Sequence, residues 1–253
     1  MPTPEQWREM IAGCTRDYIV TAHSYRGIQL GNSFSSPVVL GCSDGEDYVV
    51  KSPKNQQLLR AICNDQVMGH VAAYMLAPVP TVKIVEIPQT LVQNQRELAG
   101  IPAGPAHGSR YIPNASKTKH GIAYQNVPGN RERFAILAFM YGVAGVFSDH
   151  QFFYEDGSNL VWSFDHGHFF PKGPDWTIAT LAAAPDAVPD PTIVAGCNLT
   201  SNELADVKPR LVSVTPVSIS MAVASPVDSW GLSPDDRVAL ADHLHKRRET
   251  LCA

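Results

Sequence analysis

The sequence predicts an α+β fold with a β-rich N-terminal part and a mainly helical C-terminal part. Segments with alternating or β-branched residues gather in residues 17–52, and one long helical pattern follows at 55–76. Beyond residue 130 strongly apolar helical patterns dominate. Because strands group into sheets and helices pack in layers, this order predicts one part at 1–90 and a second at 91–253.

The first elements carry clear local signals. Thr3 can cap a helix that starts at Pro4, Gln6 stands where a capping box needs it, and this helix should end near Ala12. Strands then follow in the segments YIVTAHSY, PVVLG and EDYVVKS. The pair Asp44-Gly45 predicts a hairpin turn between the last two.

The helix predicted at 55–76 is amphipathic, and prolines end it before a strand at 82–87. Residues 88–130 are rich in Pro, Gly, Asn and Gln, which indicates a connection with short strands. An apolar helix at 131–146 and a β pair within 151–164 come next.

The final helix is predicted to start at Ser233-Pro234, with acidic residues in its first turn. Lys246-Arg247-Arg248 is then expected to form its solvated last turn, where cations suit the helix dipole.

Composition excludes several classes of function. Net charge is −4, and no other basic run exists, so a nucleic-acid-binding surface is not indicated. The five cysteines are odd in number and show no metal-ligand spacing, which argues against a disulfide framework and a structural zinc site. No apolar run reaches membrane-spanning length and the N-terminus has no apolar signal segment, so we expect a soluble, cytoplasmic protein without a membrane partner.

Some residues suit phosphoryl transfer, which needs a cation on the phosphates, a carboxylate near the attacking hydroxyl and oxygen ligands for magnesium. Lys51 ends a predicted strand. The small residues of the upstream stretch would let backbone N–H groups approach phosphates, with Ser33, Ser35 and Ser36 as candidate contacts.

Two acidic residues frame the predicted β pair. Asp149 precedes it and Asp165 follows it, just before His166-Gly167. A hairpin brings its two ends together, so both carboxylates can reach one site. The glycine suits a loop that bends closely round an ion. The segment 148–167 is therefore the candidate catalytic loop.

Two other reaction classes compete for these residues. His150, His166 and His168 could bind zinc or iron in a metallohydrolase, although no HxxxH or HExxH pattern occurs. The chain lacks the Gly-x-Ser-x-Gly elbow of a serine hydrolase, and the nearest segment, residues 107–110, does not form that pattern.

The chain resembles the HipA-like kinase domain family, a compact branch of the two-lobed protein-kinase-like fold. The segments that carry this resemblance are YVVK at 48–51, ND at 64–65 followed by APVP at 77–80, HGSR at 107–110, SDHQ at 148–151 and FDHG at 164–167. It implies a β-rich N-lobe at 1–90 and a mainly helical C-lobe at 91–253.

The resemblance also implies a role for each matching residue. Lys51 would contact the phosphates of ATP, and Asp65 would orient Lys51. Asp149 would position or deprotonate the acceptor hydroxyl, and Asp165 would bind Mg²⁺. These roles imply an ATP- and Mg²⁺-dependent kinase that transfers the γ-phosphoryl group to a hydroxyl, with Ser or Thr of a protein as the expected acceptor.

Two further implications concern the nucleotide and the metal. The strand 82–87 would lead into the hinge that holds adenine, with Glu86 and Ile87 as contacts. Family catalytic loops carry an Asn shortly after the aspartate, whereas Gln151 is the nearby amide here and is the candidate second metal ligand. This departure leaves a nucleotide-binding pseudokinase or regulatory module without turnover as the alternative. The resemblance also leaves room for an antitoxin-type partner.

Overall fold

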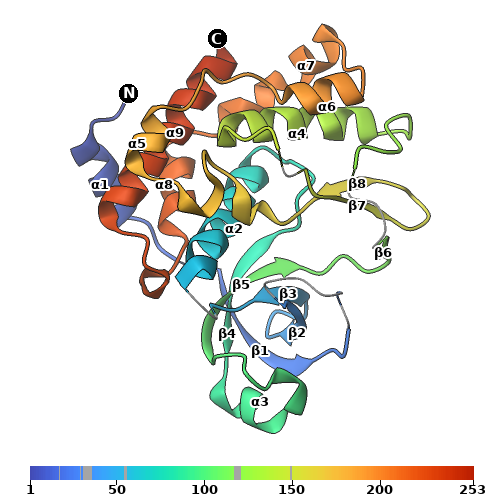
Figure 1. The fold of residues 1–253 in the computed structure, drawn as a ribbon, viewed down its shortest axis with the longest axis vertical. Helices are drawn as coiled ribbons and strands as arrows, with labels where there is room; N and C mark the ends of the chain where they lie inside the picture. The colour runs from blue at the N-terminus through green and yellow to red at the C-terminus, as the bar shows by residue number, and fades with distance from the viewer. Residues whose placement is uncertain (17, 29, 31–35, 54–55, 117–120, 149) are drawn as a thin grey trace.

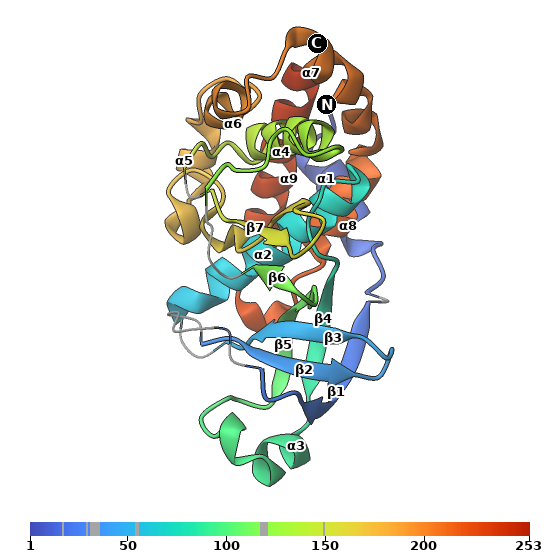
Figure 2. The same cartoon turned by 90° about the vertical axis from the view of Figure 1, so that its right-hand side faces the viewer.

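A small β-barrel and a larger helical part make up the computed structural model, which describes residues 1–253 except 17, 29, 31–35, 54–55, 117–120 and 149. In both views the barrel and α3 (Gln89–Asn94) lie at one end, the other helices lie at the other, and both termini lie among those helices (Figures 1 and 2). The protein therefore has the mixed α+β architecture that the sequence predicts.

The barrel has the strand order β1-β2-β3-β5-β4. Its strands are β1 (Ile19–Tyr25), β2 (Val38–Cys42), β3 (Asp47–Lys51), β4 (Val82–Ile87) and β5 (Gly104–Arg110). Neighbours are antiparallel except β1 and β4, whose parallel pairing closes the barrel. Alternating burial along β3 follows from the period of two in a strand, and inward side chains of the barrel form a separate apolar cluster.

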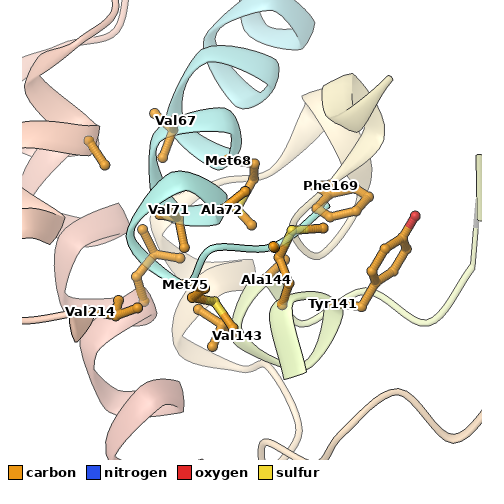
Figure 3. Close-up of a cluster of buried hydrophobic side chains, with 14 of the residues drawn as sticks. Val67, Met68, Val71, Ala72, Met75, Tyr141, Val143, Ala144, Phe169 and Val214 are labelled. Atoms are coloured by element: carbon orange, nitrogen blue, oxygen red, sulfur yellow. The ribbon is translucent and has the colours of Figure 1, made fainter. Parts of the chain in front are cut away.

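The helix α2 (Gln56–Tyr74) lies between the barrel and the other helices (Figures 1 and 2). Gly69 lets it approach β4 closely, because an added Cβ there would lie 2.3 Å from Val82. On its other side Val67, Val71 and Met75 enter the main core beside residues of α4 (Figure 3). The helix is thus buried from two directions, which positions the polar residues discussed below.

The helical part surrounds α4 (Asn130–Ala144), most of whose residues are buried. The remaining α-helices are α1 (Pro4–Ala12), α3 (Gln89–Asn94), α5 (Ile178–Ala182), α6 (Pro191–Gly196), α7 (Ser201–Val207), α8 (Pro216–Ala224) and α9 (Pro234–Cys252). Short 3-10 helices are η1 (Arg96–Leu98), η2 (His166–His168), η3 (Gly173–Asp175), η4 (Lys208–Ser213) and η5 (Asp228–Trp230). The capping box predicted at the start of α1 is present.

A three-stranded sheet connects the barrel with α4. It has the order β6-β7-β8, from β6 (Ala115–Ser116), β7 (Phe152–Glu155) and β8 (Val161–Ser163). The hairpin of β7 and β8 is the β pair that the sequence predicts. Phe152 packs edge-to-face on Phe134 of α4, so one face of this hairpin is fixed to the core.

Three expectations need correction. Residues 88–130 contain strands, as expected, but β5 is a full barrel strand, which the sequence did not locate because Gly104-Pro105-Ala106 lacks β-branched residues. The change from barrel to helices does not fall at residue 90, since β5 completes the barrel and α1 packs on α8 and α9. Arg247 does not lie in a solvated last turn. It is buried within α9 and donates to the backbone oxygens of Gly142 and Pro185.

Among the residues that the structure describes, no helix combines the length and the apolar character that crossing a membrane requires.

Candidate functional site

Lys51 stands at the centre of the candidate site. Its Nζ lies 2.8 Å from Oδ2 of Asp65 on α2 and 2.6 Å from Oδ1 of Asp165, just after β8. Asp65 and most of Lys51 are buried, whereas the side chain of Asp165 is 43% exposed. One ammonium group therefore joins the barrel, α2 and the segment after β8 at a single point.

Electrostatics keep Lys51 and Asp65 charged. Burial alone would lower the pKa of Lys51, but the charges of Asp65 and Asp165 outweigh it and raise that pKa above its usual value. Burial likewise would raise the pKa of Asp65, but the nearby Lys51 ammonium lowers it. At neutral pH the site thus presents a fixed cation beside a partly open carboxylate.

A neutral histidine lies next to this cation. His107 on β5 is the register partner of Lys51, and its Nδ1–H donates to Oε1 of Gln66, 2.8 Å away. Burial lowers the pKa of His107 to about 4, so its ring carries no charge at neutral pH. A charged ring here would compete with Lys51 for Asp65.

The backbone around Asp165 is fixed from the upstream side. The N–H of Ser163 donates to the oxygen of Pro78, and the N–H of Phe164 donates to the oxygen of Gln151. Asp165 itself has φ 59°, in the left-handed region that few non-glycine residues adopt. The hairpin therefore brings the segment before Asp165 back to Gln151. The predicted approach of Asp149 to Asp165 stays a prediction, because Asp149 lies outside the described residues.

A cavity of about 610 Å³ opens beside Asp165. It is lined by residues 145–148, by Gln151 and Asp165, and by His168 and residues 170–173. These residues come from the loop after α4 and from the segment after β8, not from the barrel strands. Asp165 therefore both contacts Lys51 of the barrel and lines this cavity.

The other predicted site residues have different outcomes. Asp149, Ser33 and Ser35 lie outside the described residues. Ser36 is exposed and stands two residues before Val38, whose register partner is Val50. It therefore lies at the same end of the barrel as Lys51.

The predicted hinge is wrong in its topology. β4 ends at Ile87 and leads into α3, at the end of the barrel that lies away from the helical part (Figures 1 and 2). Glu86 and Ile87 pair with Pro105 and Gly104 at the start of β5. The chain leaves the barrel after β5 instead, since the next strand, β6, belongs to the separate three-stranded sheet.

The histidines that suggested a metallohydrolase have other partners. His150 contacts the buried carboxylate of Asp190 at 2.9 Å and stacks on Tyr141. His166 contacts Ser163 Oγ at 2.9 Å. Within the described part of the chain, no group of three or more His, Cys, Asp or Glu side chains could hold a metal ion.

Two oxygen donors beside Lys51 suit Mg²⁺. Asp165 and Gln151 both line the cavity and offer oxygen atoms, the ligands that Mg²⁺ prefers. The adjacent Lys51 supplies the cation that phosphates require. The residues present therefore fit a Mg²⁺–nucleotide, and Asp165 and Gln151 are the residues that would hold the ion.

Sequence reasoning assigned no role to three polar residues that shape the site. Asn64 and Gln66 flank Asp65 and are fully buried, and Asp190 caps α6 while contacting His150. A polar run inside an otherwise apolar helical pattern was the available signal for the first two. Asp190 lies 40 residues from His150, and nothing local in the sequence indicates that contact.

Comparisons with known proteins agree with this geometry. A family model described as HipA-like kinase matches residues 28–165, more than half of the chain. The crystal structure of a Helicobacter pylori proinflammatory kinase, CtkA, is similar with a TM-score of 0.55, at 12% sequence identity, and covers 92% of this chain and 94% of that chain. At this identity the likeness shows the fold alone. No curated protein sequence matches the chain. The chain belongs to the HipA-like kinase family.

Proposed function

We propose that the protein is an ATP- and Mg²⁺-dependent kinase that transfers the γ-phosphoryl group of ATP to a hydroxyl, with Ser or Thr of a protein as the acceptor. Kinase chemistry follows from the family. The choice of ATP, Mg²⁺ and a protein hydroxyl is our inference from the site and from the family resemblance.

The contact of Lys51 with both Asp65 and Asp165 is the observation that carries this proposal. Phosphoryl transfer is catalysed by positioning and by charge neutralisation, and a metal ion would supply charge neutralisation on the phosphates. Lys51 is a fixed charge held by Asp65, and Asp165 is the partly exposed carboxylate beside it. Three residues from separate segments thus supply the parts that this reaction needs.

The cavity beside Asp165 supports a place for the acceptor. Phe147, Phe170 and Pro171 give it apolar walls, and Ser148 and Gln151 lie on its rim of polar groups. Such a mixed cavity suits a side chain that presents a hydroxyl group. Asp149 belongs to this loop by sequence, and we assign it the contact with the acceptor hydroxyl.

Two variants test the assignment. Asp149→Ala should abolish phosphoryl transfer and leave ATP binding largely intact, because this residue acts on the acceptor. Asp165→Ala should weaken the binding of Mg²⁺–ATP, because this residue holds the ion. Radiolabelled autophosphorylation measures transfer, and isothermal titration calorimetry with and without Mg²⁺ measures binding.

The same measurements separate the kinase from a pseudokinase. Full autophosphorylation by both variants would refute the roles assigned here. Binding of Mg²⁺–ATP by the wild-type protein without phosphoryl transfer or ATP hydrolysis would favour the regulatory module, which Gln151 in place of asparagine leaves open.

A further inference from the structure

Three consecutive residues of α2 each bind a different part of the molecule. Asp65 binds Lys51 on β3, Gln66 binds His107 on β5, and Asn64 binds the segment that follows Asp165. Consecutive helix residues point about 100° apart, so three in a row face very different directions. All three are nonetheless buried, because the barrel lies against one side of α2 and the segment after β8 against another.

Asn64 uses its whole amide group in this arrangement. Its Nδ2 donates to the oxygen of Gly167 at 2.8 Å and to the oxygen of Phe169 at 3.1 Å. Its Oδ1 accepts the indole N–H of Trp176 at 3.0 Å. Asn64 is fully buried, and thus one side chain holds three points of the segment 167–176 against α2.

The packing around these hydrogen bonds is close. An added Cβ at Gly167 would lie 3.1 Å from the Cβ of Ala61, one turn of α2 before Asn64. The guanidinium group of Arg60 lies 4.2 Å from the centre of the Trp176 ring. The contact between α2 and the segment 167–176 is thus a built interface.

This interface completes the fixation of Asp165. Upstream, the backbone bonds of Ser163 and Phe164 hold the chain. Downstream, the ring of His166 contacts Ser163 Oγ, and Asn64 holds the carbonyl of Gly167, two residues from Asp165, on α2. Between them Asp165 adopts its left-handed conformation, which costs about 1 kcal/mol or more and persists only where the surroundings impose it.

We propose that Asn64 is a positioning residue of the kinase: by holding the segment 167–176 on α2, it keeps Asp165 in the place from which it binds the metal ion beside Lys51. The same segment supplies His168 and residues 170–173 to the cavity, so Asn64 also shapes the acceptor side. This inference rests on the proposed function, because it takes Asp165 as a metal ligand.

Asparagine suits this position for a chemical reason. The two carbonyl groups need donors and the indole needs an acceptor, and a primary amide provides both within one short side chain. Alanine at this position would leave three buried polar groups without partners. A residue that merely fills space could not replace it.

The test compares Asn64→Ala with a matched variant, Asn130→Ala. Asn130 is equally buried, donates through Nδ2 to the oxygens of Tyr124 and Asn159, and accepts the N–H of Val161. It therefore controls for the loss of an asparagine with three backbone contacts, at a place that does not touch the segment 167–176.

Two measurements report on positioning rather than on overall stability. The first is the rate of trypsin cleavage after Lys172, an exposed residue within the held segment, since cleavage requires local opening. The second is the ratio of ATP affinities with and without Mg²⁺, measured by calorimetry on folded protein. Asn64→Ala should raise the cleavage rate about tenfold and lower the affinity ratio about tenfold, as loss of a residue that orients a metal ligand does.

Asn130→Ala should lower the melting temperature and leave both quantities close to wild type. If Asn64→Ala behaves like wild type, or if both variants change both quantities equally, Asn64 has no positioning role. If Asn64→Ala does not fold, Trp176→Phe removes one of the three contacts and should raise cleavage after Lys172 about threefold; an unchanged rate would refute the proposal. A wild-type protein that binds ATP equally with and without Mg²⁺ would instead refute the proposed function, while the cleavage experiment would still test the contact.

Discussion

Replacing Asp65 by asparagine tests the electrostatic centre of the protein. The substitution keeps the shape of the side chain and removes its charge. Asp65 is 4% exposed and its Oδ2 lies 2.8 Å from the ammonium of Lys51, so the lost charge is a buried one. The variant leaves Lys51 with Asp165 as its remaining carboxylate partner among those described.

The expected loss of stability follows from this geometry. Removing one partner of a buried ion pair costs about 3–5 kcal/mol when the other charge is left alone. Lys51 keeps Asp165 at 2.6 Å, and asparagine still offers an oxygen acceptor. We therefore expect a loss of about 2 kcal/mol in the free energy of unfolding at neutral pH, the value of a hydrogen bond between charged groups.

The pH dependence has a definite sign. The pKa of Asp65 in the folded protein lies below that of an unfolded chain, which is about 3.9. Its contribution to stability is complete above about pH 4 and is lost as the pH falls through the folded pKa. The difference between wild type and Asp65→Asn should therefore be constant from pH 5 to 8 and shrink below about pH 4.

Urea unfolding at a series of pH values measures this difference. Asp235→Asn is the matched control, because Asp235 forms a similar 3.0 Å pair with Arg8 but both side chains are largely exposed. That variant should lose less than about 1 kcal/mol. Equal losses for the two variants, or a difference for Asp65→Asn that grows at acidic pH, would refute the reasoning.

Two further predictions concern the neighbours of this centre. The ring of His107 should titrate near pH 4 by NMR, and stability should fall between about pH 6.5 and 4, because the unfolded chain binds a proton there and the folded protein does not. A midpoint near 6.5 would contradict the burial argument. Gly167→Ala should cost about 1–3 kcal/mol in urea unfolding, because its Cβ would meet the Cβ of Ala61 at 3.1 Å on the rigid α2; a neutral result would show that the segment can move away from α2.

Local patterns were enough for most of the fold. Four barrel strands, α2 and the β7–β8 hairpin carry β-branched runs or a period of two or 3.6 residues that can be recognised in the sequence. Lys51 and Asp165 stand at strand ends, where a side chain can reach a site, and the hairpin spacing alone predicts that Asp165 returns to the start of β7. Each of these inferences depends on residues close together in the chain.

Tertiary structure decided what such patterns cannot encode. β5 is a strand because β3 and β4 offer it hydrogen-bonding partners on both sides, although Gly104-Pro105 has little strand propensity of its own. The contacts of Asn64 with Gly167 and of His150 with Asp190 join residues 103 and 40 positions apart. A polar side chain becomes a positioning group only when packing buries it against a particular partner. That partner lies far away in the sequence, so the residues next to the side chain do not reveal it.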